Sequence, residues 1–538
     1  MNKTKLSDLP QTAVEYIDSV IKAMKYRRKV RAEVRKELMS HFSDALTDCE
    51  SEQQQQDCVK ELIKEFGNVK MLGKLMRLAK KRCRPLWQQA TLVVFKVIGI
   101  IFLLLLLRVG YMATGRPTIS VDYTQWMNDK VRDGRDESLN AYHDYQRAIE
   151  LMSKDMPPEI EKIEKYPREQ QKTPEDWLAI EAFLETEAEA IKVFRQGTAK
   201  PYYWNIYKAT KEHGKLMAFP ADVMENLMPK LSPIKKIARR IVYFQIPLDI
   251  HRGNTKQAVD DSIALYIYGQ HLHSQGVLIE QLVGVAIEAM AISGITDVLS
   301  QVDLSASELH RFQKIVEKDY DPDIAPMDWS LEKAFWYDAI QRAFTDDGQG
   351  NGRPLPRGTL FAVSNRMDYL TGLISGFPDR KEVVDDLDEF FERFNAYRKF
   401  KPKTLHGMEE QGLFRVDKLQ FMQQVSDPAM RKTIEISWRM RAGQAGLIGT
   451  LAVLRFEKET GRLPDNWGKL LGKGYFKTIP MDPYSDGPLI YKKTDAGFTL
   501  YSVGSNFIDD GGVPGTDKDG EPKKWGENGD IIFWPVVP

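Results

Sequence analysis

The chain has 538 residues, 76 basic and 76 acidic side chains, and three cysteines. This length favours three or more folding units, and so few cysteines exclude a disulfide-stapled framework. The balanced charge does not favour a nucleic-acid-binding protein, and we expect no nucleic-acid partner.

Apolar residues recur at helical spacing in residues 12–80, which predicts a small helical bundle that ends near residue 86. The Gly67-Asn68 pair favours a left-handed helix end. The first helix would bury Val14, Ile17, Ile21 and Met24, and the last would bury Met71, Leu72, Leu75, Met76 and Ala79.

Three segments of this bundle carry a family pattern: VEYIDSVIKAM, VRKELMSHFSDAL and CVKELIKEFGNVKMLGKLM. They resemble the HAAS or permease-prefix domain, a short helical domain that precedes transmembrane segments in many bacterial membrane proteins. The resemblance implies a sensing or protein-docking module without a catalytic role. A generic basic bundle beside a membrane is the alternative interpretation.

The run Thr91–Gly110 is apolar over 20 residues, about the length that a helix needs to cross a hydrocarbon core of roughly 30 Å. Trp87 and Tyr111 bracket it, as interfacial aromatic residues do. Lys96 and Arg108 lie toward its ends, where long basic side chains can reach the interface. We therefore predict one membrane-spanning helix, with membrane lipid as its partner.

The charge distribution predicts the orientation of this helix. Residues 1–90 hold 19 Lys and Arg against 12 Asp and Glu, whereas the rest of the chain is acidic. Segments rich in Lys and Arg beside a membrane helix usually stay in the cytoplasm. We therefore expect a cytoplasmic N-terminus, an extracytoplasmic location for most of the chain, and insertion in the inner (cytoplasmic) membrane. The basic cluster before the run is Lys80, Lys81, Arg82 and Arg84, and the three cysteines, Cys49, Cys58 and Cys83, lie on the same side.

After a spanning segment at residues 87–112 and a linker at 113–139, the chain is mostly amphipathic helix, which predicts an all-α domain over 140–440. No family resemblance is found for this domain. In Ala442–Phe456 a ridge of small residues predicts close packing against the helical domain rather than against a partner protein. The ridge consists of Ala442, Ala445, Gly446, Gly449 and Ala452. The clearest predicted helices are 140–153, 173–195, 233–244, 255–273, 275–298, 305–318, 331–344, 380–400 and 427–459.

The stretch 276–299 is long and apolar, but Glu280 and Glu288 interrupt it, which argues against a second membrane span. We interpret it as a buried central helix. Buried acids can act in catalysis, but pairing with Arg or Lys from neighbouring helices is the commoner arrangement, and we predict a protein that is not an enzyme. The alternative is an extracytoplasmic hydrolase that uses one of these glutamates.

Other catalytic motifs are weak. Ser232 and Lys235 match the S-x-x-K of penicillin-recognising enzymes, but the K-T-G partner motif is absent, and Ser-Pro is also an ordinary helix start. His271 and His273 are two residues apart and diverge on a helix, so they cannot share a metal ion. We therefore assign no catalytic or cofactor-binding residues.

From Gly461 the composition changes to Gly, Pro, Asp and β-forming residues. Leu489–Lys493 and Phe498–Val503 predict a hairpin, and Ile531–Trp534 a third strand. Residues 441–538 are therefore expected to form a small α+β module.

An acidic, Gly-rich loop lies between the hairpin and the third strand. Clustered oxygen ligands on such a loop suit calcium, which takes six to eight of them, although the spacing is not that of an EF-hand. A solvated acidic loop without an ion fits equally well. The acidic and amide residues of the loop are Asn506, Asp509, Asp510, Asp517, Asp519 and Asp530.

The module also resembles the C-terminal half of the major pseudopilin of type II secretion. The resemblance implies a calcium-binding loop with Asn506, Asp530 and either Asp509 or Asp510 as ligands. A prepilin cleavage signal is absent and the apolar helix lies far upstream, so a borrowed, calcium-stabilised domain is favoured over pseudopilus assembly. The matching motifs are GRLP at Gly461–Pro464, IPMDP at Ile479–Pro483, LYSVG at Leu500–Gly504, DDGG at Asp509–Gly512 and GDII at Gly529–Ile532.

These patterns together predict a mainly α, single-pass membrane protein of the bacterial cell envelope. We expect a non-catalytic role in binding or assembly with a protein partner in the envelope, connected with secretion. A transmembrane sensor that signals through the N-terminal bundle is, with the hydrolase, the remaining alternative.

Overall fold

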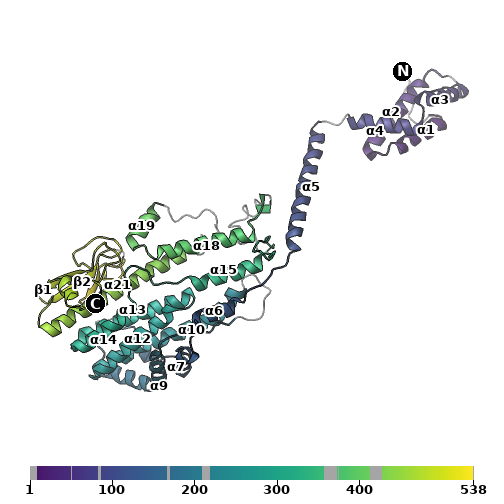
Figure 1. The fold of residues 1–538 in the computed structure, drawn as a ribbon. Helices are drawn as coiled ribbons and strands as arrows, with labels where there is room; N and C mark the ends of the chain where they lie inside the picture. Colours follow the sequence, from purple (N-terminus) through teal and green to yellow (C-terminus); the bar gives the residue numbers. More distant parts are fainter. Residues whose placement is uncertain are drawn as a thin grey trace. The chain divides into compact units, whose positions relative to one another are not determined.

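The computed structural model describes residues 9–49, 51–82, 86–166, 170–208, 218–356, 372–373, 375–411, 427–526 and 528–536. It is mainly helical with one small three-stranded sheet, which confirms the predicted fold class at this level (Figure 1). The chain forms two compact units, residues 1–107 and 108–538. Cys83 and Arg84 lie outside the described residues.

The first unit begins with a bundle of four helices, as the sequence predicts. Gly67 has a φ of 76° and ends the third helix, which confirms the predicted stop. Ser51 begins that helix with a capping box. The helices are α1 (Gln11–Ala23), α2 (Arg28–Ala45), α3 (Glu52–Phe66) and α4 (Val69–Arg82).

The inner face of α4 differs from the prediction. Met71 and Leu75 are 65% and 54% exposed, whereas Leu72 and Met76 pack against the core of the bundle. Gly73 is buried, and a Cβ atom there would lie 3.0 Å from the backbone nitrogen of Met24, so α4 faces α1 through this glycine. Met71 and Leu75 form one apolar pair with a spacing of four residues, and Leu72 and Met76 form another. Sequence periodicity alone could not show which pair faces the core.

Two described helices are long and apolar enough to span a membrane, judged by length and composition only. One is Val93–Ala113, which lies within α5 (Leu86–Ala113). Helix α5 contains the whole predicted run Thr91–Gly110. The other is α13 (Leu278–Gln301), of which 67% of the apolar window is buried inside the protein. Such burial is typical of a core helix, the interpretation that the sequence favours for α13.

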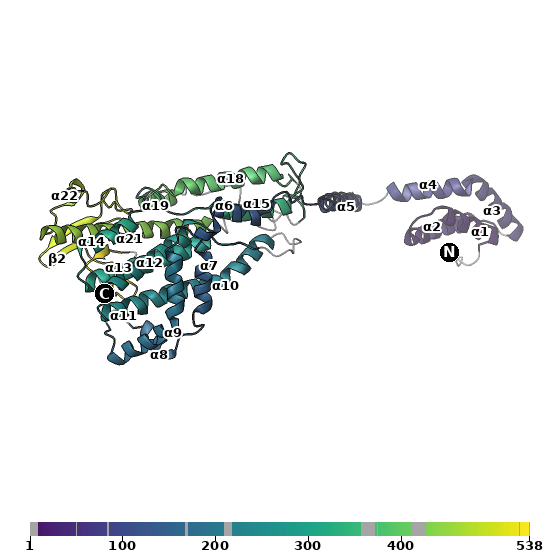
Figure 2. The same ribbon diagram turned by 60° about the horizontal axis from the view of Figure 1, so that its bottom comes forward.

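The second unit follows the predicted helix order closely (Figures 1 and 2). A 3₁₀ turn, η1 (Glu137–Leu139), and a π-helical turn, η2 (Ile241–Gln245), complete the order. The helices are α6 (Tyr123–Arg132), α7 (Tyr142–Leu151), α8 (Pro158–Glu164), α9 (Pro174–Thr198), α10 (Ala218–Arg240), α11 (Ile246–His251), α12 (Thr255–Ser274), α13, α14 (Ala306–Val316), α15 (Ser330–Ala343), α18 (Arg380–Tyr397), α19 (Pro402–Glu410), α21 (Asp427–Thr460) and α22 (Trp467–Gly472).

One predicted boundary in this unit is wrong. We expected a helix to start at Pro233, but α10 begins earlier and contains Pro229 and Pro233 in its interior. An interior proline removes one backbone hydrogen bond. Apolar packing compensates for this loss, because Leu231 and Ile234 beside the second proline are buried. Ser232 is therefore inside a helix rather than at its start.

Helices α12 and α13 pack against each other along their lengths, and α21 lies beside α13 and α14 (Figure 2). One continuous apolar cluster extends from α6 to the C-terminal sheet. Trp329 and Trp438 are among its largest fully buried side chains. The sheet and the helices therefore share one core.

The C-terminal sheet has the antiparallel order β1-β2-β3, which confirms the predicted hairpin and third strand. Its strands are β1 (Ile490–Thr494), β2 (Gly497–Ser502) and β3 (Ile531–Trp534). The sheet packs on α21: a Cβ atom at Gly446 would lie 2.3 Å from Phe533, and one at Gly449 would lie 3.0 Å from Leu500. The expectation that these two glycines face the helical domain is therefore wrong.

Candidate functional site

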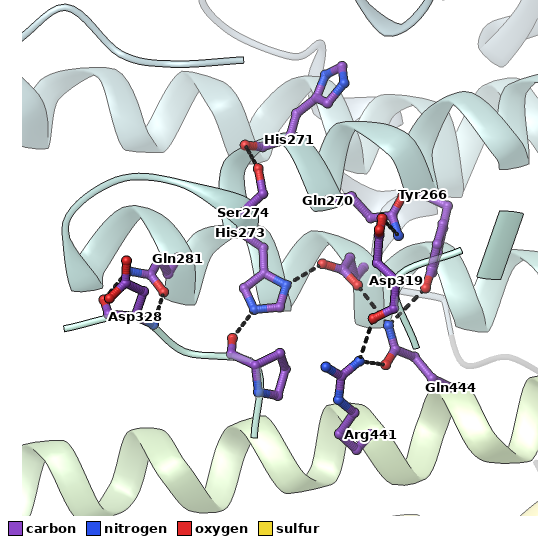
Figure 3. Close-up of polar contacts among 12 residues, drawn as sticks. Tyr266, Gln270, His271, His273, Ser274, Gln281, Asp319, Asp328, Arg441 and Gln444 are labelled. Atoms are coloured by element: carbon purple, nitrogen blue, oxygen red, sulfur yellow. Dashed lines mark hydrogen bonds and ion pairs between the residues drawn. The ribbon is translucent and has the colours of Figure 1, made fainter. Parts of the chain in front are cut away.

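A buried polar network joins α12, α13 and α21 around Glu288 (Figure 3). His273 Nδ1 lies 2.8 Å from Glu288 Oε1, and the other ring nitrogen contacts the carbonyl oxygen of Pro326. Gln444 Nε2 donates to Glu288 Oε2 at 3.4 Å and to the Tyr266 hydroxyl at 2.9 Å. Both carboxylate oxygens of Glu288 therefore have hydrogen-bond partners within the protein.

Arg441 of α21 extends this network without touching Glu288. Its Nη1 donates to Gln444 Oε1 at 2.8 Å and to the carbonyl oxygen of Asp319 at 3.1 Å (Figure 3). Its Nε donates to the carbonyl oxygen of Ile324 at 3.1 Å. Burial lowers the pKa of Arg441, while the nearby charge of Glu288 raises it. Arg441 thus ties the loop after α14 to the core.

Two glycines allow α12 and α13 to approach this closely. A Cβ atom at Gly269 would lie 2.5 Å from Glu288 Cγ, and one at Gly284 would lie 2.4 Å from the backbone nitrogen of His273. Small residues at such crossings let two helix backbones come together. The position of the His273–Glu288 pair therefore depends on this close packing.

Glu280 lies in the first turn of α13, on a different side of the helix from Glu288. Its carboxylate accepts hydrogen bonds from the Tyr207 hydroxyl at 2.5 Å, from Asn205 Nδ2 at 2.8 Å and from the Val277 backbone N–H at 3.1 Å. Burial raises the pKa of Glu280, although these three donors oppose the shift. The carboxyl is satisfied by uncharged groups.

Among the described residues, no Lys or Arg forms an ion pair with either acid, in contrast to the expectation from the sequence. Of these residues only His273 lies at ion-pair distance from Glu288, and this pair is ionic only when the imidazole is protonated. Neither glutamate lines the pockets described for this structure. Both side chains are enclosed in protein hydrogen bonds, which is an arrangement typical of structural groups.

The other candidate residues lie apart. Ser232 and Lys235 are both exposed on α10. His271 is buried against α7, where its Nδ1 lies 2.7 Å from the Tyr145 hydroxyl, and burial lowers its pKa to about 4. His273 points to the opposite side of α12, so the predicted divergence of the two histidines is confirmed (Figure 3).

An apolar pocket of about 570 Å³ lies between α13, α21, β3 and the loop before β3. This volume is in the range of small-molecule sites, which are mostly apolar and about 300–1,000 Å³. From α13 come Leu282, Val285, Ala286, Ala289, Ile292, Ser293 and Thr296, and from the C-terminal module come Pro514, Pro522, Lys523, Lys524, Trp525, Ile532, Phe533 and Val536.

The charged groups of the pocket are all basic. Among the described residues that line it, the charged side chains are Arg439, Lys523 and Lys524. Arg439 is paired with Glu435, 2.5 Å away, while Lys524 Nζ lies 5.7 Å from the centre of the Phe533 ring. The described lining of the pocket is therefore mainly apolar, with basic side chains among it.

The acidic loop brings the predicted calcium ligands near one another. Asp530 accepts hydrogen bonds from the backbone N–H groups of Asp510 at 3.2 Å and Gly512 at 2.6 Å. Burial raises the pKa of Asp530, and the charges of Asp509 and Asp510 raise it further. The carboxylates of Asp509, Asp510 and Asp530 are therefore close enough to repel one another electrostatically.

The remaining loop residues are arranged differently. Asn506 Nδ2 donates to Asp510 Oδ2 at 2.8 Å, whereas Asp509 accepts from the Tyr501 hydroxyl at 2.9 Å. Asp517 belongs to a separate turn, where it accepts from the backbone of Asp519. In the described part of the chain, no three His, Cys, Asp or Glu side chains are placed to hold a metal ion. Calcium therefore stays a prediction.

No protein family, characterised protein or solved structure matches this chain. The resemblances to the permease-prefix domain and to the pseudopilin therefore remain predictions from the quoted motifs.

The pocket was not predicted from the sequence, although the sequence contains one signal for it. The predicted central helix has few polar residues and no continuous polar face, whereas a helix at a protein surface normally has one. In the structure its uncovered stripe, Leu282, Ala286, Ala289 and Ser293, lines the pocket. Which elements would form the opposite wall was not predictable from local pattern.

Proposed function

We propose that this chain is a membrane-anchored binding protein that holds an apolar ligand between α13, α21 and the C-terminal module. The observation that carries this proposal is the apolar pocket of about 570 Å³. Its lining contains small side chains, Ala286, Ala289 and Gly443, which leave room for a ligand. The enzyme alternative has less support, because Glu280 and Glu288 lie outside the pocket and are held by protein donors.

The setting of this activity comes from the sequence. We propose that Thr91–Gly110 anchors the protein in the inner membrane, with the N-terminal bundle in the cytoplasm as a docking module and the pocket outside the cytoplasm. The basic flank of residues 80–84 supports this direction. A protein partner in the envelope, a connection with secretion and calcium binding by the acidic loop belong to the same proposal.

Ligand binding can be tested by protection of an introduced thiol. Ser293 lines the pocket, while Ser300 is exposed on the same helix outside it. The chain has no cysteine after Cys83, so Ser293→Cys and Ser300→Cys each add one thiol that peptide mass spectrometry can follow. In the full-length protein in liposomes, decanol should slow alkylation at position 293 and leave position 300 unchanged.

A pocket-filling variant provides the control for this experiment. A Cβ atom at Gly443 would make only an ordinary contact, 3.5 Å from Ile292, so Gly443→Leu should fold and occupy the pocket. Gly407 of α19 has open space around it, and Gly407→Leu is the matched control. Protection should be lost with the first variant and kept with the second. Equal protection of both thiols, or of neither, would refute the binding site.

The same variant tests the orientation of the chain. A membrane-impermeant maleimide should modify Ser300→Cys in intact cells, because Ser300 is exposed and we place it outside the cytoplasm. Cys83 precedes the apolar run and should react only after lysis. Reaction of Cys83 but not of position 300 in intact cells would reverse the proposed orientation.

A further inference from the structure

The wall that α13 presents to the pocket is a stripe of apolar and small residues. Leu282, Ala286, Ala289 and Ser293 follow each other at intervals of four, three and four residues, so they lie on one face of the helix. The opposite faces of α13 pack into the core. Because this stripe is mostly apolar and its residues are small, it provides a surface that fits a hydrocarbon chain.

The cationic groups stand on the α21 and loop sides of the same pocket. Lys523 and Lys524 come from the loop before β3, and Arg439 comes from α21. Arg439 also pairs with Glu435, and the charged side chains in the described lining are all basic. A ligand with a negative group at one end would complement this arrangement.

We infer that the ligand is a single-chain amphiphile with an anionic head, a carboxylate or a phosphate, and an aliphatic chain. The chain would lie along the α13 stripe, and the head would face Lys523 and Lys524. This inference rests on the proposed function, because it names the class of ligand for the same pocket.

The experiment compares amphiphiles in the thiol-protection assay with Ser293→Cys. Octanoate, decanoate and dodecanoate should protect at successively lower concentrations, by about fourfold for each added methylene, since each buried methylene contributes about 0.8 kcal/mol. Decyl phosphate should protect like decanoate. Decanol and decyltrimethylammonium should need higher concentrations than decanoate.

Charge variants separate the head from the chain. Replacement of both lysines, Lys523→Gln with Lys524→Gln, should raise the half-protecting concentration of decanoate by about two- to tenfold, as expected for exposed ion pairs. The same replacement should leave decanol unchanged. If decanol protects as well as decanoate, the anionic head is wrong while the apolar site stands. If no amphiphile protects, the site and the proposed function both fail.

A second observation, in the N-terminal bundle, is independent of the pocket. The sulfur atoms of Cys49 and Cys58 lie 2.7 Å apart, compared with about 2.05 Å in a disulfide bond. Both residues are half-buried against the core of the bundle, and they connect the end of α2 to α3. Gln55 Nε2 donates to the carbonyl oxygen of Cys49 at 3.2 Å, which holds this turn on α3.

The geometry points to a reversible intramolecular disulfide between Cys49 and Cys58. One thiolate attacks the disulfide of an oxidant such as glutathione disulfide and releases one glutathione thiol. The second thiolate then attacks the mixed disulfide and releases the other, so that the chain loses two protons and two electrons. In a reducing cytoplasm such a bond would form only transiently.

The test equilibrates the full-length protein in liposomes with glutathione disulfide, followed by alkylation and peptide mass spectrometry. The peptides of Cys49 and Cys58 should be found joined and unalkylated, while Cys83 takes up the reagent. In a Cys58→Ser variant, Cys49 should instead carry glutathione. Alkylation of both cysteines in the oxidised wild-type protein, or a bond from either one to Cys83, would overturn the assignment.

Discussion

The close packing of α12 and α13 predicts that Gly284→Ala destabilises the protein. A Cβ atom at this position would lie 2.4 Å from the backbone nitrogen of His273 and 2.8 Å from the carbonyl oxygen of Gly269. Both neighbours are backbone atoms, so no flexible side chain can move away. The two helices must separate, and the contacts between them must lengthen.

The size of the effect follows from this geometry. Real Cβ contacts begin at about 3.4 Å, so the helices have to move apart by roughly 1 Å, and a gap of that size removes a quarter to a half of the dispersion energy of each contact. Overpacking in a core typically costs about 1–3 kcal/mol. We expect the upper end of this range, because α12 and α13 contact each other along their lengths and the Glu288 network crosses the same interface.

The assay is thermal and urea unfolding of the full-length protein in detergent, followed by circular dichroism. Gly407→Ala is the matched control, because it adds the same methyl group to a helix with nothing within 4 Å, and it should be neutral or stabilising by up to about 1 kcal/mol. If Gly284→Ala unfolds at the same temperature and urea concentration as the wild type, the proposed packing of α12 on α13 is wrong.

Three further predictions concern charged groups. Burial raises the pKa of Glu332 from 4.5 to about 7. Because the folded state binds this proton more tightly than the unfolded state, the contribution of Glu332 to stability is highest below pH 4.5 and falls by up to about 3 kcal/mol as the pH rises to 7. The melting temperature of Glu332→Gln should therefore be higher than that of the wild type at pH 8 and equal to it at pH 4. Glu187 pairs with buried Arg240 at 2.5 Å, and Glu187→Leu should lower the free energy of unfolding by about 3–5 kcal/mol, much of which Arg240→Met in the same chain should restore when measured in urea. If the acidic loop binds calcium, calcium at one hundred times its dissociation constant should add about 2.7 kcal/mol to the free energy of unfolding and so raise the melting temperature. Asp530→Asn should abolish this response. An unchanged melting temperature of the wild type after chelation would contradict the calcium prediction.

Local sequence signals predicted most elements of the fold. Capping residues, apolar periodicity and glycine stops gave α9, α12 and α14 within a few residues, and the alternation of residues around Thr494–Gly497 gave the hairpin. These features depend on neighbours in the chain, because a cap or an apolar face is defined within one or two turns. The start of α10 was missed, since buried apolar residues carry the helix through two prolines.

The site could be predicted only in part. The sequence marked Glu280 and Glu288 as buried acids, but their partners, Tyr207, His273 and Gln444, come from other segments of the chain. No spacing rule links such positions, because the partners meet only after the helices pack. For the same reason the sequence could not show that both acids lie away from the pocket.

By itself, the sequence determined that this protein is mainly helical, that it has one exposed apolar helix and one buried one, and that it ends in a three-stranded module. These properties follow from composition and periodicity, which act along the chain. Only the tertiary structure decided that the uncovered stripe of α13 meets Lys523 and Lys524 across a pocket. The stripe of α13 and the two lysines are more than 200 positions apart in the sequence. They line the same pocket because the sheet packs on Gly446 and Gly449 of α21.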